Sequence, residues 1–400
     1  MKRRYSLPRY LAGASAARAG DEMSGPALML AGFALTGSAT AASSLLAGIT
    51  VSAAVGGPVL GALLDRAVRP GRVLAWALVL YAAGLGTVLA GLGRWPLPVT
   101  ILIAVVTGLL GPALSGGWTA QLPRVVPGER LPRANTLDAM TFGGASLAGP
   151  ALAGGVAEAL GASMSVVVAV ALIASALPAA WLLPARPGRA RDARTTSVIS
   201  DLTAGMRVIA GRRPLARATL TSVVSCAAQG MLAACVPLLG ERVLGGAGRG
   251  ALLLSCAAVS ALLANAALAQ FPRSVAPDTI IWGSALVQAV ALALAAWGQP
   301  VVLIVAVLLA GVGEGPQLAA LFAVRHREAP DHLRGQIFTT GASLKITGFS
   351  LGAAVAGPLA AWSLPGALAL AASVAALAAA AFFAIPSAPV DSSEDRAMTR

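Results

Sequence analysis

The sequence predicts an all-α membrane protein with twelve transmembrane helices arranged as two halves of six. Of its 400 residues, 57% are hydrophobic and only 11% are charged, whereas soluble domains are about 25% charged. The apolar residues fall into runs of about 20, the length that crosses the hydrocarbon core of a bilayer. Arginines gather between alternate runs, as expected when those links share one side of the membrane.

The predicted helices are joined by short polar links. In chain order they cover residues 9–36, 40–64, 73–92, 97–120, 135–160, 162–184, 215–239, 249–271, 277–298, 300–323, 335–361 and 364–386. The first helix is the most polar because it contains Arg18, Asp21 and Glu22.

A polar, arginine-rich segment at 185–214 divides the chain into an N-terminal half (1–184) and a C-terminal half (215–386). The halves carry Gly-Pro pairs in the same order, offset by about 200 residues, as in membrane proteins built from internal repeats. These pairs are Gly111-Pro112 with Gly315-Pro316, and Gly149-Pro150 with Gly357-Pro358.

The distal part of the dividing segment has apolar residues at helical spacing, namely Val198, Ile199, Leu202, Met206 and Ile209. This spacing predicts an amphipathic helix that lies on the inner surface of the membrane. A partly ordered linker is the alternative that the spacing leaves open. The polar tail at 387–400 is expected to be disordered.

The arginine distribution predicts that both termini are cytoplasmic and that the protein lies in the inner, or plasma, membrane. The predicted cytoplasmic links hold most of the arginines, whereas the predicted outer links hold little beyond Arg94, Arg242 and Arg249. The net charge of +13 would also suit a nucleic-acid partner. Because the basic residues lie between apolar runs, membrane orientation explains them and no nucleic-acid partner is expected.

The link between the second and third helices resembles the loop 2–3 signature of the major facilitator superfamily. It reads Gly61-x-x-x-Asp65-Arg66, followed by Arg69 and Arg72, with the Gly-Arg pair arriving late behind Pro70. The resemblance implies that Asp65 meets the N-terminus of the eleventh helix, near Arg334, and holds an inner gate shut. An aspartate is favoured there by the positive end of the helix dipole.

Two further stretches resemble the drug-proton antiporter branch of that superfamily, which includes macrolide and enterobactin exporters. One is the link from Leu122 to Asn135; the other is a glycine-rich motif in the fifth helix, with Gly144, Gly149, Pro150 and Gly154. The arginine that many such antiporters carry inside the fourth helix is missing, because 99–120 contains no charge.

Acidic residues inside a membrane are costly and therefore become functional candidates. Asp21 and Glu22 lie about a dozen residues into the first helix, near the midplane. Arg18 is one turn earlier and can pair with either of them. In one reading Arg18 simply neutralises one of the two acids. In the other, the carboxylate that is left over carries a proton.

Glu314 in the tenth helix and Lys345 in the eleventh are expected at similar depths, near the midplane. They are interpreted either as a buried ion pair that locks the two helices together or as a titrating carboxylate with its charge partner. Asp138 is expected in the first turn of the fifth helix, where a carboxylate is structural.

Several uncharged polar residues inside the predicted helices could line a cavity or pair between helices. The cavity candidates are Gln121, Gln229 and Gln317. Cys226, Cys235 and Cys256 have no metal-ligand spacing, and no nucleophile–base pair or phosphate-binding glycine motif is visible. We therefore expect no metal, no cofactor and no enzymatic activity.

The resemblance implies a secondary transporter that works by alternating access around a midplane site. The first hypothesis is proton-coupled efflux of a small amphipathic molecule, such as a drug, siderophore or secondary metabolite, by a monomer in the lipid bilayer. Proton-coupled import of a small metabolite and a non-transporting receptor with a transporter fold are the alternatives. A membrane-embedded enzyme would need clustered His, Asp or Cys residues, which the sequence lacks.

Overall fold

A computed structural model describes residues 6–37, 39–185, 198–245, 250–271 and 275–385. The N-terminal helices are α1 (Leu7–Thr36), α2 (Ala39–Arg66), α3 (Pro70–Gly91), α4 (Leu97–Gly108), α5 (Leu131–Leu160), α6 (Ala162–Ser175) and α7 (Leu177–Trp181). After α8 (Val198–Gly211) follow α9 (Arg213–Leu244), α10 (Gly250–Gln270), α11 (Pro277–Ala295), α12 (Pro300–Glu328), α13 (Arg334–Trp362) and α14 (Leu364–Ala384). The described residues contain no strand, so the predicted all-α class is confirmed.

Nine helical segments in the described ranges are long and apolar enough to cross a bilayer. Two of them join consecutive elements: Leu97–Gly117 combines α4 with a π-helical turn, η1 (Ala113–Gly117), and Ala162–Trp181 combines α6 with α7. The remaining long helices are α1, α5 and α13, with 30, 30 and 29 residues. Charged and small residues lower their hydropathy, but their length suffices to cross a bilayer. Nine and three give the predicted twelve.

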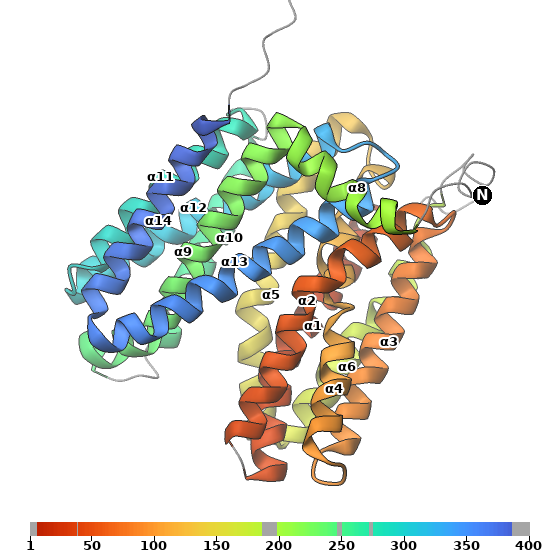
Figure 1. The fold of residues 1–400 in the computed structure, drawn as a ribbon, viewed down its shortest axis with the longest axis horizontal. Helices are drawn as coiled ribbons and strands as arrows, with labels where there is room; N and C mark the ends of the chain where they lie inside the picture. The colour runs from red at the N-terminus through yellow and green to blue at the C-terminus, as the bar shows by residue number, and fades with distance from the viewer. Residues whose placement is uncertain (1–5, 38, 186–197, 246–249, 272–274, 386–400) are drawn as a thin grey trace, which may run out of the picture.

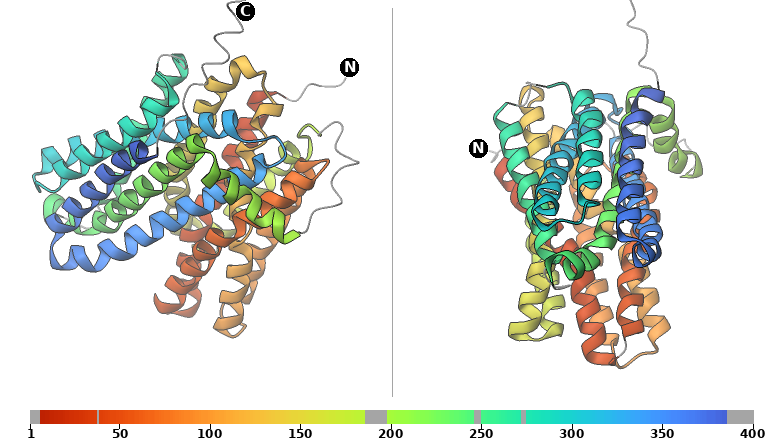
Figure 2. Two further views of the ribbon diagram at one scale, coloured as in Figure 1. Left: turned by 45° about the horizontal axis from the view of Figure 1, so that its top comes forward. Right: turned by 90° about the vertical axis from the view of Figure 1, so that its left-hand side faces the viewer.

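The helices form two bundles, each with its own apolar core. One core cluster runs from Tyr10 to Leu183, and others lie entirely between Ile209 and Phe382. Figure 1 shows the bundles meeting at the end that carries α8 and diverging like an inverted V towards the other end. In the left view of Figure 2 the C-terminal bundle again extends to the left and the N-terminal bundle towards the bottom, while α2 packs on α13 and α5 on α10.

The segment from Val198 to Gly211 forms a helix, α8, where the sequence left an amphipathic helix and a partly ordered linker open. α8 packs against α2, α9 and α13 and so contacts both bundles. The backbone N–H of Gly205 donates to Gln336 Oε1 on α13 at 3.1 Å. α8 therefore packs against both bundles at the end where they meet. Most of the arginine-rich segment before it and the tail at 387–400 lie outside the described residues.

Candidate functional site

The two bundles are tied together by Asp65 at the end of α2. Its Oδ1 accepts from the backbone N–H of Gly335 and its Oδ2 from that of Gln336, both at 2.8 Å. These N–H groups belong to the first turn of α13, which has no intrahelical acceptors for them. Asp65 is only 5% exposed. The contact that the motif resemblance implied is thus present, and it joins the two halves.

Glycines let α2 and α13 approach closely enough for this contact. A Cβ at Gly61 would overlap the backbone of Gln336, and one at Gly57 would overlap the carbonyl of Thr339. Thr339 Oγ1 donates to the Gly57 carbonyl at 2.6 Å. Gly61 is therefore required by packing as well as by the motif.

Two arginines of the motif contact residues other than Asp65. Arg334 pairs with Asp331 at 2.5 Å, and Arg72 lies over the ring of Trp181, 5.4 Å from its centroid. Arg69 is exposed and Arg66 is half-buried.

Beside Asp65, apolar side chains from both halves form one cluster, which we call the inter-half cluster. Its members are Ala120, Ala139 and Phe142 of the N-terminal half and Leu268, Leu318, Ala319, Phe322 and Phe338 of the C-terminal half. The Phe142 and Phe322 rings lie 5.6 Å apart, and those of Phe322 and Phe338 lie 5.9 Å apart. This cluster is therefore an apolar contact between the two halves.

The structure corrects the expected partner of Arg18. Its Nη1 donates to Asp138 Oδ1 at 2.9 Å and its Nη2 to Thr119 Oγ1 at 2.9 Å. Tyr10 and Thr119 donate to the same carboxylate, at 3.0 and 2.8 Å, and Thr141 is a further partner of Arg18. α5 begins at Leu131, so Asp138 lies well beyond the first turn, fully buried. The expected structural position of Asp138 at a helix N-terminus is therefore wrong, and its partner is a buried arginine.

Because Arg18 is bound to Asp138, the two acids of α1 have neutral hydrogen-bond partners. Tyr81 of α3 donates to Asp21 Oδ1 at 2.7 Å, and Ser146 of α5 donates to Glu22 Oε1 at 3.4 Å. Glu22 is exposed and Asp21 is half-buried. Tyr81 was not selected from the sequence. It is one of three tyrosines in the chain and lies inside an apolar helix, and this was the signal that could have identified it as a partner of an acid.

Glu314 and Lys345 are close enough to interact electrostatically. In the part of the chain that the structure describes, however, no ion pair within 4 Å joins them. Glu314 is exposed and Lys345 is half-buried. An ion pair that locks α12 to α13 is therefore not formed among the described residues in this conformation, and the reading of Glu314 as a titrating carboxylate stays a prediction.

Gln229 and Gln317 pair between helices, which is one of the two alternatives that the sequence left open for the cavity candidates. Gln229 of α9 donates to Gln288 of α11 at 3.2 Å, and Gln288 donates to Gln317 of α12 at 3.4 Å. Gln317 donates in turn to Ser225 at 3.1 Å. Gln121 is 1% exposed and donates to the Gly117 carbonyl at 3.1 Å.

In the glycine-rich motif of α5, Gly149 is required for helix packing, whereas the other positions have free space around them or are exposed. A Cβ at Gly149 would overlap Glu22 and the backbone of α1, so this glycine brings α5 against the acidic residues. A Cβ at Gly144 or Gly154 would meet nothing within 4 Å, and Pro150 is exposed.

Arg325 and His326 near the end of α12 were not selected from the sequence, because they read as part of a polar loop. Arg325 is 1% exposed and His326 6%. Arg325 Nε and Nη2 and both ring nitrogens of His326 have no hydrogen-bond partner in the described ranges. Both side chains lie against Phe338 of the inter-half cluster, with ring centroids 4.5 Å apart for His326 and the guanidinium 5.7 Å away for Arg325.

No group of three His, Cys, Asp or Glu side chains is placed to hold a metal ion within the ranges described. The ionisable side chains of this region contact other residues of the chain.

Comparison with known proteins places this arrangement in a family. Residues 10–344 match the model of the Major Facilitator Superfamily. The chain is 28% identical over 364 residues to the uncharacterized MFS-type transporter y4rN of Sinorhizobium fredii (strain NBRC 101917 / NGR234), covering 86% of this chain and 87% of that protein.

Solved structures share the fold at low sequence identity. The human organic anion transporter MFSD10 (TETRAN) matches with a TM-score of 0.78 at 16% identity, covering 96% of this chain and 100% of the other. The E. coli fucose:proton symporter FucP (N162A) matches with 0.75 at 15%, covering 96% and 100%. A bacterial homologue of the iron transporter ferroportin, in its outward-facing state, matches with 0.73 at 16%, covering 94% and 98%. The chain belongs to the Major Facilitator Superfamily and is a multi-pass membrane transporter for a small-molecule substrate.

Proposed function

We propose that this chain exports a small amphipathic molecule in exchange for protons, by alternating access, as a member of the drug-proton antiporter branch. The observation that carries the proposal is the pairing of Arg18 with Asp138 at 2.9 Å. Within the described residues, this pairing leaves Asp21 and Glu22 with hydroxyl groups as their side-chain hydrogen-bond partners. A carboxylate that is not neutralised by an arginine is free to bind and release a proton.

The position of the acids supports proton exchange. Glu22 and Glu314 come from different halves and are both exposed, although they lie in the middle of long helices. Acids within membrane-spanning helices are costly and mark ion and substrate pathways. We assign Asp21 and Glu22 the first place in proton coupling and Glu314 the second.

The arginine-rich links support a cytoplasmic location for the closed end. Asp65 and the inter-half cluster join the bundles at the end that carries Arg66, Arg69 and Arg72. The excess of arginine favours the cytoplasm, so we propose that both termini are cytoplasmic and that this conformation opens outward. Release of Asp65 from α13 would then open the inner end.

Proton-driven transport in proteoliposomes tests the proposal. A deletion strain is first grown against a panel of antibiotics and siderophores, and the compound with the largest effect serves as the transported probe. Purified wild type, Asp21→Asn, Glu22→Gln and Glu314→Gln are then compared under an imposed pH gradient. We expect the α1 variants to lose proton-driven flux while probe binding persists. Glu158→Gln, an exposed acid near the end of α5, is the matched control.

Two outcomes contradict the proposal in different ways. Unchanged coupling in all three variants would exclude these acids as proton carriers. Movement of the probe in the same direction as the protons would favour import, as in the fucose:proton symporter that shares this fold.

A further inference from the structure

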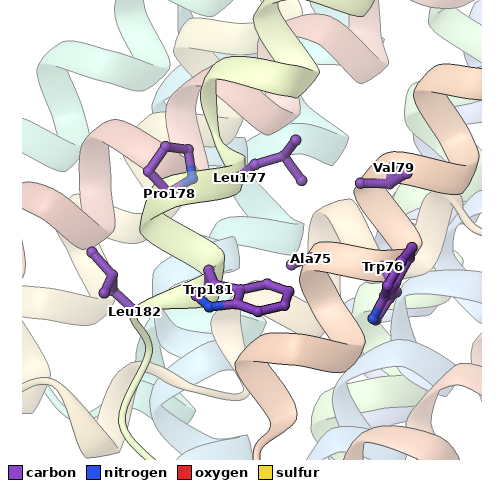
Figure 3. Close-up of a pocket in the computed structure, with 7 residues that line it drawn as sticks. All are labelled: Ala75, Trp76, Val79, Leu177, Pro178, Trp181 and Leu182. Carbon is purple, nitrogen blue, oxygen red and sulfur yellow. The ribbon is translucent and has the colours of Figure 1, made fainter.

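An apolar groove lies on the surface of the N-terminal half, between α3 and α7. Its volume is about 480 Å³, and its walls include Ala75, Trp76 and Val79 of α3 and Pro178, Trp181 and Leu182 at α7. Figure 3 shows the two tryptophans on opposite walls, with Ala75 between them. Trp76 is 58% exposed and Trp181 is 51% exposed. None of the acids of the proposed transport site is among the residues that line this groove.

The groove follows from a break in the sixth span. α6 ends at Ser175, and α7 restarts at Leu177 with Pro178 in its first turn. A proline lacks the N–H needed to continue the helix, so the chain changes course there. Gly71 holds the start of α3 close to α7, because a Cβ at this position would overlap the carbonyl of Ala180. The small side chain of Ala75 then leaves the space between the tryptophans open.

A positive charge stands at the mouth of the groove. Arg72 lies one turn before Trp76 on α3, and its guanidinium is 5.4 Å from the centroid of the Trp181 ring. Arg72 and Arg69 are both exposed. None of the ion pairs recorded among the described residues uses Arg72. An apolar groove with a cation at one end is complementary to a molecule with an apolar chain and an anionic head.

A second groove lies on the other side of α7. Its volume is about 430 Å³, it is lined by Arg9, Ala12 and Ala16 of α1, and it shares Pro178 and Leu182 with the first. Two neighbouring grooves separated by one short helix match the two chains of a diacyl lipid. Basic pockets between membrane helices are known to select anionic headgroups.

We propose that an anionic phospholipid binds at α7, with one acyl chain between Trp76 and Trp181, the other in the groove beside Ala12, and its phosphate at Arg72. This site is independent of the transported substrate. Tryptophans at its walls also suit the membrane interface, where their rings are enriched.

Native mass spectrometry of the detergent-purified full chain tests the site with two lipids of identical acyl chains. Palmitoyl-oleoyl phosphatidylglycerol is the anionic probe, and palmitoyl-oleoyl glycerol, a diacylglycerol without a phosphate, is the neutral one. Wild type should bind the anionic lipid more tightly. Arg72→Gln should weaken that lipid about fivefold, the effect expected of one basic residue near a membrane surface, and leave the neutral lipid unchanged. Arg72→Lys should keep the preference.

Two further variants separate the groove from the charge. Val79→Trp fills the groove without changing Arg72 and should weaken both lipids. Arg94→Gln removes an exposed arginine beside Trp95, beyond the opposite end of α3, and should change neither. Thermal unfolding of each variant shows that it is folded. Equal binding of the two lipids by wild type, or equal losses in Arg72→Gln and Arg94→Gln, would overturn the proposal, and so would full binding by Val79→Trp.

Discussion

The two halves each bury an arginine beside the inter-half cluster, and the two arginines are treated differently. Arg18 of α1 is 2% exposed and Arg325 of α12 is 1% exposed. Arg18 lies 3.7 Å over the Phe142 ring and Arg325 lies 5.7 Å over the Phe338 ring. Arg18 has a carboxylate and several oxygen acceptors, whereas Arg325 Nε and Nη2 have no partner in the described residues.

The difference teaches that burial alone does not define the role of a charge. The Arg18–Asp138 pair belongs entirely to the N-terminal half, so it persists however the halves move. Arg325 lies against Phe338, which also packs on the N-terminal half near Gly116. Because an uncompensated buried charge is costly, Arg325 should favour a conformation in which the inner end opens and water or an anion reaches it.

The largest expected effect is that of Asp138→Asn. The change leaves the Arg18 guanidinium buried without a counter-charge, which costs about 3–5 kcal/mol in comparable sites. The midpoint of thermal unfolding in detergent should fall markedly. Arg18→Met combined with Asp138→Asn should recover part of the loss, because no uncompensated charge remains.

Asp278→Asn is the matched control for this prediction. Asp278 pairs with Arg217 at 2.6 Å, but the two side chains are 29% and 13% exposed. A partly exposed pair is worth up to about 1 kcal/mol. Equal losses in Asp138→Asn and Asp278→Asn would remove the special status of the buried pair.

Arg325→Met should have the opposite sign. The methionine keeps an apolar stem beside Phe338 while the unpartnered charge, whose burial carries a desolvation penalty, is removed. We expect a higher thermal midpoint together with slower transport, because the closed inner end is favoured. A lower midpoint would show that Arg325 has a partner that stabilises this conformation, and the contrast with Arg18 would not hold.

Asp65→Asn should have a smaller effect on stability and a clear effect on transport. The variant loses one of two charge-assisted bonds to the first turn of α13, worth about 1.5–3 kcal/mol. A cysteine at Thr340, 2% exposed in the inner region of α13, should become more reactive towards a thiol reagent when Asp65 is replaced. The background for this measurement lacks Cys226, Cys235 and Cys256.

Asp331→Asn is the control for Asp65, because Asp331 has an 87% exposed side chain and pairs only with the neighbouring Arg334 among the recorded ion pairs. It should change neither reactivity nor flux. Unaltered transport and cysteine reactivity in Asp65→Asn would remove the gating role.

Lys345→Met should have the smallest effect on stability. Lys345 is half-buried and forms no ion pair within 4 Å with Glu314 in the described part of the structure. The expected loss is within about 1 kcal/mol. A loss as large as that of Asp138→Asn would restore the ionic lock between α12 and α13 and would make Glu314 structural.

The all-α class, the number of spans and their order along the chain could be predicted from the sequence. Each of these features depends on the length of apolar runs and the spacing of charges, which the bilayer thickness constrains locally. The position of Asp65 against α13 was also accessible, because a short motif sets an acid at a helix end and the motif resemblance supplied its partner. A helix at α8 was one of the two alternatives that its apolar spacing left open.

Only the tertiary structure decided which charges meet. Pairing of Arg18 with an acid one turn away on α1 is worth only a few tenths of a kcal/mol, whereas Asp138 offers a buried carboxylate already bonded to Tyr10 and Thr119. Arg18 of α1 also bonds to Thr119, which belongs to the uncharged fourth predicted helix at 97–120. Partner choice depends on how helices far apart in sequence rotate and pack, and a linear pattern does not contain that information.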